Sequence, residues 1–156
     1  MVRYGAFGDQ IMITPLIKAL HEDGYSVTVN ISSNAADVLK HNPYIDNMIL
    51  QERDVIFNPE LGQYWAEWVN EYDKYINLSE SVEGNLLKVE GRQDFYTSNE
   101  YRRKLGNTNY YKYTMKLGGY PDYPNPKGEL FFSNLEEKAI TNWVIVTGKQ
   151  IGRAHV

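Results

Sequence analysis

The chain alternates short apolar runs of strand-like period with longer runs at helical spacing, and this alternation is what most constrains its fold. The first unit is the clearest, because residues 2–4 lead through a glycine turn into an amphipathic segment. Its apolar residues share one helical face: Ile13, Leu16, Ile17 and Leu20. Strands that alternate with helices favour a parallel sheet covered by helices. We therefore expect an α/β fold built on a Rossmann-like parallel sheet.

Further elements follow from the same periodicities. Strands are expected at 2–4, 27–31, 47–50, 74–78 and 129–132. Helices are expected at five places: from 9–12 to the stop at Gly24, at 33–39, around 61–72, at 110–117 and at 133–142. Ser133 and Glu136 form the capping box of the last helix. Residues 80–109 are polar and give no secondary-structure prediction.

Composition removes several classes of function. Apolar residues make up 42% and charged residues 23%, which is ordinary for a globular domain. The net charge of −4 argues against non-specific nucleic-acid binding. The absence of cysteine excludes disulfides, thiol catalysis and cysteine-based zinc sites, and the three histidines lack metal-ligand spacing. Without a membrane-spanning run or a signal peptide, we expect a cytoplasmic protein that has no metal site.

We interpret both ends of the chain as truncated. Only four residues precede Gly5, fewer than a first buried strand usually has, so we expect the natural start to lie upstream of Met1. A common sequencing adapter (ATC GGA AGA GCA CAC GTC) encodes the final hexapeptide, 151–156, which we interpret as read-through. The expected organisation is one domain over 1–141 and the first strand of a truncated second domain over 142–150. A native C-terminal tail is the alternative.

The turn that follows the first strand carries the candidate chemistry. In open parallel sheets, ligands bind beyond the carboxyl ends of the strands, where helices begin. Gly5 and Gly8 allow a close approach of backbone to ligand, and N–H groups at a helix start favour anions. Asp9 stands at that helix start. It is either a helix cap or an ionised carboxylate at the mouth of a cleft.

Several short motifs, in this order, resemble the heptosyltransferases of glycosyltransferase family 9. They are Gly8-Asp9, Thr14-Pro15, Leu20, Val27-Thr28-Val29, Asn42-Pro43-Tyr44-Ile45-Asp46, Asp73 and Asn77-Leu78. The resemblance is good over 3–78, thin over 79–126 and present again over 143–146. It implies the N-terminal, acceptor-side domain of a GT-B type glycosyltransferase, whose two Rossmann-like domains face each other across a cleft.

The resemblance also implies an activity. The parent would be an inverting enzyme that moves a heptose-like sugar from a nucleotide-sugar donor, expected to be ADP-linked, to a lipopolysaccharide-type glycan acceptor. Asp9 matches the family's proposed general base, which accepts the proton of the acceptor hydroxyl. The donor-binding residues belong to the second domain, so this chain alone is expected to be inactive. No cofactor is implied, and the setting is the cytoplasm, with room for peripheral contact with the inner membrane surface.

The candidate substrate-binding residues are Gly5, Gly8, Thr14, Arg102 and Arg103. Arg102 and Arg103 could meet phosphates of an inner-core acceptor, although a solvated surface run explains them as well. Two other functions stay open. A dinucleotide-binding domain is disfavoured, because the turn reads G-x-x-G and the second strand ends without a carboxylate. A non-catalytic carbohydrate-binding domain is compatible with every motif.

Overall fold

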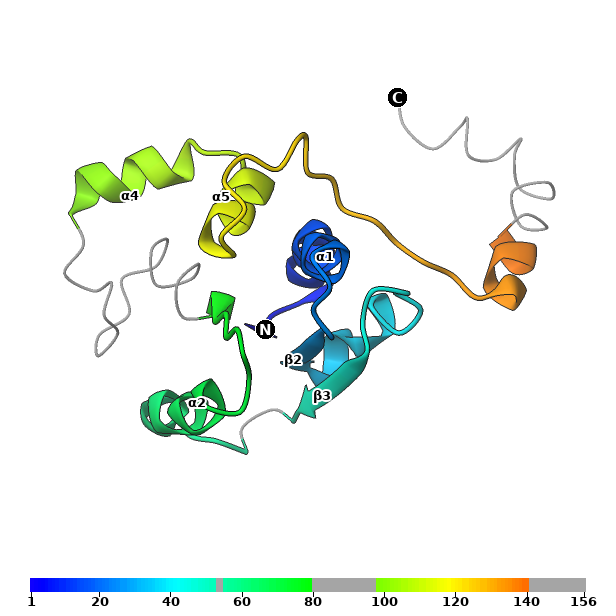
Figure 1. Ribbon diagram of the computed structural model, residues 1–156, viewed down its shortest axis with the longest axis horizontal. Coiled ribbons are helices and arrows are strands. Elements are labelled where there is room, and N and C mark those ends of the chain that lie inside the picture. Colours follow the sequence, from blue (N-terminus) through cyan, green and yellow to red (C-terminus); the bar gives the residue numbers. More distant parts are fainter. Residues whose placement is uncertain (53–54, 80–97, 141–156) are drawn as a thin grey trace, which may run out of the picture.

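The computed structural model describes residues 1–52, 55–79 and 98–140 (Figure 1). The expectations for 142–150 and 151–156 lie outside these residues, as does most of the polar stretch after residue 79. Within the described residues, no helix combines the length and the apolar character needed to cross a membrane.

Three parallel strands form the sheet, which confirms the α/β prediction. They are β1 (Val2–Arg3), β2 (Thr28–Ser32) and β3 (Asn47–Gln51), in the spatial order β1-β2-β3. Val2 lies opposite Asn30, which in turn lies opposite Ile49. On its other side, Val2 forms a parallel bridge with Asn77. Residues near 77 therefore occupy the place of a fourth strand, and the order is that of a Rossmann-like half.

The prediction is wrong for two strands, which do not form in the structure. The fourth strand, expected at 74–78, is reduced to that single bridge. The Val2 amide donates to the Ile76 carbonyl at 2.8 Å, but the amide of Tyr4, just after β1, binds the side chain of Ser79. Residues 78–79 are already helical, so the strand does not continue. Residues 129–132 form no strand either. Their first amide, that of Glu129, donates to the Thr14 hydroxyl, so this segment runs along a helix rather than along the sheet.

Helix α1 (Phe7–Glu22) begins earlier than expected and contains Pro15 in its interior. A proline there removes one backbone donor and leaves the carbonyl four residues earlier unpaired. That carbonyl belongs to Ile11, and the Thr14 hydroxyl donates to it at 2.8 Å. The side chain thus replaces the lost donor, and the helix continues to Glu22 before Gly24, whose φ is +87°.

The core lies between α1, the sheet and helix α5 (Tyr110–Leu117), whose bounds match the prediction. Figure 1 shows α1 between α5 and the strands. Leu16 and Ile17 of α1 are fully buried. The contact between α1 and α5 is close at Gly118, where an added Cβ would lie 2.3 Å from Leu16 Cδ1.

The remaining elements lie outside this core. They are η1 (Ser33–Val38), η2 (Asn58–Glu60), α2 (Leu61–Val69), α4 (Asn99–Gly106) and a helix from 134 to 140. The expected capping box is confirmed, because Glu136 Oε2 accepts from the Ser133 amide at 2.8 Å and the Glu136 amide donates to Ser133 Oγ at 3.2 Å. Before β3, the Asp46 carboxylate accepts from the Val27 amide at 2.6 Å and joins the starts of two strands.

Candidate active site

A cleft of about 500 Å³ opens at the carboxyl ends of the three strands. Tyr4 follows β1, Ser32 ends β2 and Gln51 ends β3, so each strand delivers one residue to it. The full lining is Tyr4, Gly5, Ala6, Ser32, Ser33, Asn34, Gln51, Glu52, Ile56 and Leu61. This is the edge at which ligands bind in open α/β sheets. Hydroxyl, amide and carboxylate groups line it together with a few apolar side chains.

Gly5 is fixed by the geometry of the turn. Its φ is +133°, a conformation that residues with a side chain rarely adopt. A Cβ at this position would lie 2.2 Å from Asp9 Oδ2. The glycine therefore lets the turn fold directly against the Asp9 carboxylate.

Three consecutive amides of this turn donate to side chains of the protein. The Tyr4 amide binds Ser79 Oγ at 2.5 Å, the Gly5 amide binds Ser32 Oγ at 3.1 Å, and the Ala6 amide binds Asp9 Oδ2 at 2.8 Å. The expectation that the turn presents unused N–H groups to an anion is therefore wrong for these three. What the turn offers to the cleft is side-chain chemistry on a backbone that is already held in place.

Of the two roles that the sequence left open for Asp9, the structure shows the helix cap. As the third residue of α1 it reaches back to the Ala6 amide, so it caps the helix. Its other oxygen, Oδ1, accepts from Arg3 Nη2 at 2.5 Å. The side chain of Arg3 is 2% exposed, whereas that of Asp9 is 31% exposed. The carboxylate thus sits between a buried cation and solvent. Asp9 does not itself line the cleft, but it adjoins the cleft through Gly5 and Ala6, which do.

Arg3 and Tyr110 are the site residues that sequence reasoning missed. Arg3 Nη2 also contacts the Tyr110 hydroxyl at 3.4 Å, and the Arg3 carbonyl accepts from Gln10 Nε2 at 3.0 Å. A charged residue inside a very short apolar strand was the available signal for Arg3. Nothing local marks Tyr110, because 107 positions separate it from Arg3.

The other predicted substrate-binding residues are placed differently from one another. Gly8 is exposed in the first turn of α1, and an added Cβ would meet nothing within 4 Å. Thr14 is buried, and its hydroxyl serves Ile11 and Glu129, so its contacts are those of a packing residue. Arg102 and Arg103 lie on α4 and do not line the cleft. The structure therefore brings together Gly5, Gly8 and Asp9 alone.

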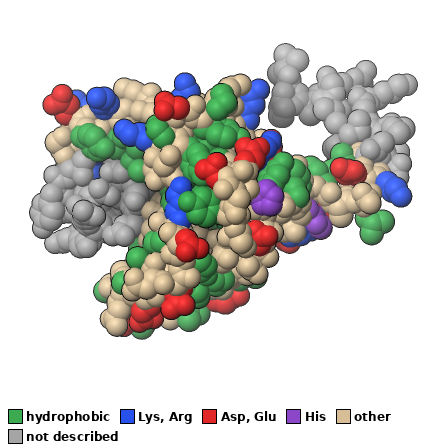
Figure 2. Space-filling model, viewed as in Figure 1, with side chains coloured by type: hydrophobic (Ala, Val, Ile, Leu, Met, Phe, Trp, Pro, Cys, Tyr) green, Lys and Arg blue, Asp and Glu red, His purple; other side chains and the backbone are tan. Residues whose placement is uncertain are grey.

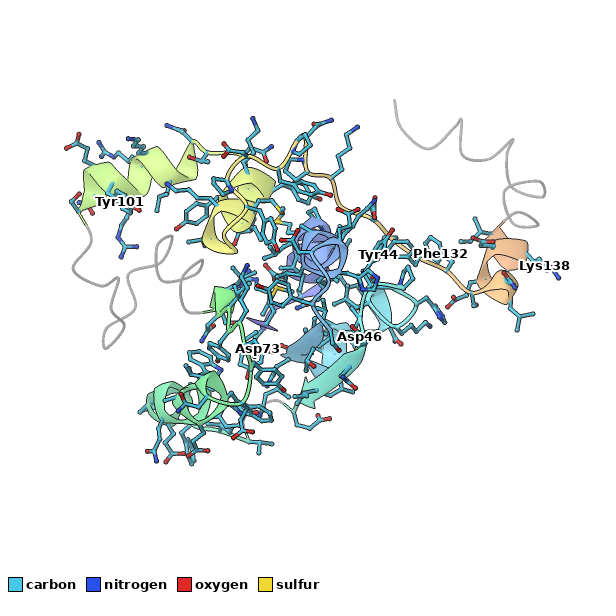
Figure 3. The ribbon with its side chains drawn as sticks, in the orientation of Figure 1. Tyr44, Asp46, Asp73, Tyr101, Phe132 and Lys138 are labelled. Atoms are coloured by element: carbon cyan, nitrogen blue, oxygen red, sulfur yellow. The ribbon has the colours of Figure 1, made fainter. Side chains whose placement is uncertain are left out.

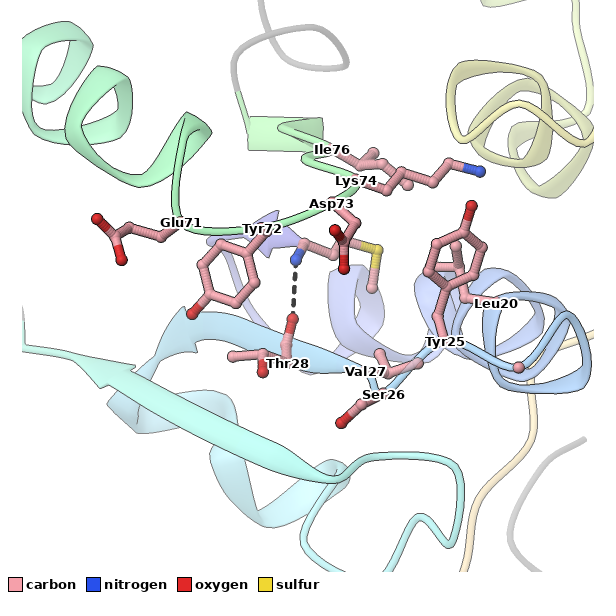
Figure 4. A pocket seen from close by; sticks show the side chains of 12 residues that line it. Leu20, Tyr25, Ser26, Val27, Thr28, Glu71, Tyr72, Asp73, Lys74 and Ile76 are labelled. Atoms are coloured by element: carbon pink, nitrogen blue, oxygen red, sulfur yellow. Dashed lines mark hydrogen bonds between the residues drawn. The ribbon is translucent and has the colours of Figure 1, made fainter.

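A second cavity, of about 310 Å³, lies at the opposite, amino ends of the strands (Figure 4). Tyr25, Tyr72 and Lys74 contribute side chains to its wall. The Lys74 ammonium lies 5.4 Å from the ring centre of Tyr25 and 4.6 Å from that of Tyr120. In neither cavity, nor elsewhere in the described parts of the chain, do three His, Asp or Glu side chains gather as metal ligands would.

Comparison with known proteins supports the fold. No protein-family model and no curated protein sequence matches the chain. A solved structure of a glycosyl transferase family 9 protein from Veillonella parvula DSM 2008 is similar, with a TM-score of 0.55 and 14% sequence identity. The likeness covers 94% of this chain and 48% of that protein, so the chain spans about half the length of its structural relative. The chain therefore has the α/β fold found in a family 9 glycosyltransferase.

Proposed function

We propose that this chain is the acceptor-side part of an inverting glycosyltransferase, with Asp9 as its general base. The observation that carries the proposal is the position of the Asp9 carboxylate. It is partly exposed beside the polar cleft at the carboxyl ends of the strands, within a fold similar to that of a glycosyltransferase. A carboxylate placed in this way can accept a proton from a hydroxyl group bound in the cleft.

The proposed reaction needs few protein groups on this side. An acceptor hydroxyl attacks the anomeric carbon of the donor sugar while the bond from that carbon to the nucleoside diphosphate breaks on the opposite face. The hydroxyl proton passes to Asp9, and the diphosphate departs with the bonding electron pair. Ser32, Ser33 and Asn34 offer hydrogen-bonding groups of the kind that hold sugar hydroxyls.

Arg3 supports this role by fixing its partner. A buried guanidinium requires a counter-charge, because leaving it without one is costly. Its bond to Asp9 Oδ1 and the Ala6 bond to Oδ2 together fix the orientation of the carboxylate. Arg3 is thus a positioning residue.

The donor side belongs to a second domain in this proposal. A nucleotide-sugar, expected to be ADP-linked and heptose-like, would meet the cleft from that domain, and a lipopolysaccharide-type glycan would occupy the cleft as acceptor. Catalysis needs both substrates in contact. Transfer is therefore expected from a protein that carries this chain together with a donor domain, and not from this chain alone.

Asp9→Asn in such a two-domain protein tests the proposal. Loss of a general base typically lowers the rate about 10²–10⁴-fold, and we expect that range for glycosyl transfer. Asp37→Asn is the matched control, because it makes the same chemical change on a side chain that is 86% exposed. Turnover by Asp9→Asn close to that of the control would show that Asp9 serves only the helix start and Arg3.

Stability has to be followed in the same variant. Because Asp9 is the counter-charge of a buried arginine, we expect Asp9→Asn to lower the free energy of unfolding by about 2 kcal/mol, less than for a fully buried pair. Urea unfolding measures this loss. A rate deficit far larger than the unfolded fraction separates the chemical role from the structural one.

One observation favours a second candidate, a non-catalytic carbohydrate-binding domain. Both carboxylate oxygens of Asp9 already accept hydrogen bonds within the protein. If the second candidate is correct, a two-domain protein would bind glycans in the cleft and transfer no sugar. Asp9→Asn would then change stability alone.

A further inference from the structure

Among the described residues that line the cleft at the carboxyl ends of the strands, Tyr4 is the only aromatic one. It directly follows β1 and is half-buried. Its amide donates to Ser79 Oγ. The centre of its ring lies 6.0 Å from that of Trp65, a residue of α2 whose side chain is buried. The backbone and the ring of Tyr4 are therefore both held in place.

The hydrogen bond between Trp65 and Tyr4 has a fixed direction. Trp65 Nε1 lies 3.3 Å from the Tyr4 hydroxyl oxygen. An indole N–H can only donate, so the Tyr4 oxygen is the acceptor and its own O–H proton is not used in this bond. Within residues 1–52, 55–79 and 98–140, no group accepts that proton. Burial raises the pKa of Tyr4, so the phenol keeps the proton at neutral pH and can give it to a ligand in the cleft.

The charged groups around the cleft are mainly acidic. Glu52, the residue after β3, lines the cleft, and its Oε2 accepts from Ser33 Oγ at 3.0 Å. Residues 55–79, which include α2, contain four Asp or Glu and one Lys. Figure 2 shows Asp and Glu side chains over the part of the molecule that α2 occupies in Figure 1. These carboxylates repel an anionic ligand group such as a phosphate and leave an uncharged hydroxyl unaffected.

We propose that Tyr4 is a substrate-binding residue, whose hydroxyl donates a hydrogen bond to a hydroxyl oxygen of an uncharged sugar unit in the cleft. A sugar hydroxyl can accept from Tyr4 and still donate its own proton to an acceptor such as Glu52. An ionised phosphate oxygen can only accept. The inference rests on the proposed function in taking the ligand to be a glycan, but it requires binding alone and no transfer.

Trp65 acts in this arrangement through Tyr4. A hydroxyl group can rotate to suit its partners, and the indole N–H excludes those orientations in which the Tyr4 proton points at Trp65. The orientations that are left are those open to another acceptor. Figure 3 shows side chains of α2 directed towards the strands, and Trp65 reaches Tyr4 from that helix. Trp65 is therefore a positioning residue for the Tyr4 hydroxyl.

Calorimetric titration of this chain with deacylated lipopolysaccharide core oligosaccharide tests the inference without any donor. Tyr4→Phe removes the hydroxyl and keeps the ring. The net contribution of one neutral hydrogen bond corresponds to about a two- to tenfold change in affinity, so we expect the Kd to rise by that factor. Tyr101→Phe is the matched control, because it makes the same change on an exposed ring of α4 (Figure 3). It should bind as the parent chain does.

A double-mutant cycle tests the role of Trp65 and gives a second route to the Tyr4 hydroxyl. Trp65→Phe keeps an aromatic ring and removes the N–H, so binding should weaken by a smaller factor than in Tyr4→Phe. In the Tyr4→Phe background the same substitution should not change the affinity further, because its effect passes through the hydroxyl. Equal losses in both backgrounds would show that Trp65 acts by packing and does not position Tyr4. Circular dichroism establishes that each variant is folded.

The charge of the bound group is tested with the same oligosaccharide after enzymatic removal of its phosphates. Tyr4→Phe should weaken binding of both forms by the same factor, and an effect confined to the phosphorylated form would show that Tyr4 meets a phosphate. Unchanged affinity in folded Tyr4→Phe overturns this inference alone, because the transferase proposal depends on turnover by Asp9 variants. If the parent chain binds neither form, this inference fails together with the proposed acceptor.

Discussion

The two ends of the sheet differ in how their polar groups are used. At the carboxyl ends, serine and aspartate side chains hold the backbone of the glycine turn, and a buried arginine orients Asp9 beside an open cleft. At the amino ends, polar groups tie elements to one another. Lys74 lies over two tyrosine rings, and the Tyr120 hydroxyl donates to Asp23 Oδ2 at 2.6 Å.

Cavity size alone does not reveal this difference, because both ends are hollow. At one end, hydrogen bonds hold a turn rigid and leave hydroxyl and carboxylate groups beside solvent. At the other end, burial and a hydrogen bond to Asp23 raise the pKa of Tyr120, so the phenol stays neutral and keeps donating. A rigid turn with polar side chains beside solvent suits substrate binding and catalysis. Interactions that join one element to another, as at the amino ends, suit stability.

The largest effect is expected from two glycines of positive φ, one at each end. Gly5→Ala should lower the free energy of unfolding by about 3 kcal/mol, because it adds both backbone strain and a clash with Asp9. Gly24→Ala should cost about 1 kcal/mol, since its Cβ would meet nothing within 4 Å. Urea unfolding measures both. Equal losses would mean that the contact of Gly5 with Asp9 is unimportant.

A smaller effect on stability is expected from a substitution at the amino ends of the strands. Lys74→Met keeps the length of the side chain and removes its attraction to the rings of Tyr25 and Tyr120, so stability should fall by about 1 kcal/mol. Glycan binding, measured by calorimetry or by chemical-shift changes, should not change. If binding weakened with Lys74→Met, the amino-end cavity and not the carboxyl-end cleft would be the site.

Gly8→Ala tests the carboxyl end of the sheet through a rise in stability, where the preceding substitutions lower it. Alanine is the better helix former, so we expect stability to rise by about 0.5 kcal/mol, while glycan affinity falls because the new methyl group occupies the open side of the first turn. Gly62→Ala, in α2, is the control, since its Cβ is also unobstructed. It should raise stability and leave affinity alone. Unchanged affinity in Gly8→Ala would remove Gly8 from the site.

The smallest expected effect is a pH dependence of the stability of the helix at 134–140. Hydrogen bonds from Lys40 and Ser133 lower the pKa of Glu136 from 4.5 to about 2. Its contribution to folding is therefore complete above pH 4.5 and is lost as the pH falls towards 2. The protection factors of the amides of residues 134–140, which are corrected for the intrinsic exchange rate at each pH, should fall across that window before those of the core amides. In Glu136→Gln this early fall should be absent, and a fall that persisted would point to another carboxylate.

Local patterns predicted those elements whose apolar faces are buried. Helix α5 has the expected bounds because Tyr113 and Met115 are buried and Gly118 follows it. Helix α4 was missed because it buries nothing, so it has no apolar period to detect. Its Ser98 cap, which accepts from the Tyr101 amide, was the remaining signal.

The site was predictable only where its chemistry lies within one turn of the chain. Gly5 and Asp9 were found because they are four residues apart. Ser79, Ser32 and Tyr110 reach the same place through the order of the strands and the packing of α5, and no local pattern carries that information. The role of Thr14 was also hidden, because its second partner, Glu129, is 115 positions away.

The hydrogen bond of the Thr14 hydroxyl constrains how this sequence can evolve. It supplies the donor that Pro15 cannot, so the fitness of either residue depends on the other. A lineage that lost the hydroxyl first would leave the Ile11 carbonyl unpaired inside a helix. A lineage that replaced the proline first would regain a backbone donor, and position 14 would become freer to change. Descent away from this pair therefore has a preferred order, with Pro15 replaced before Thr14.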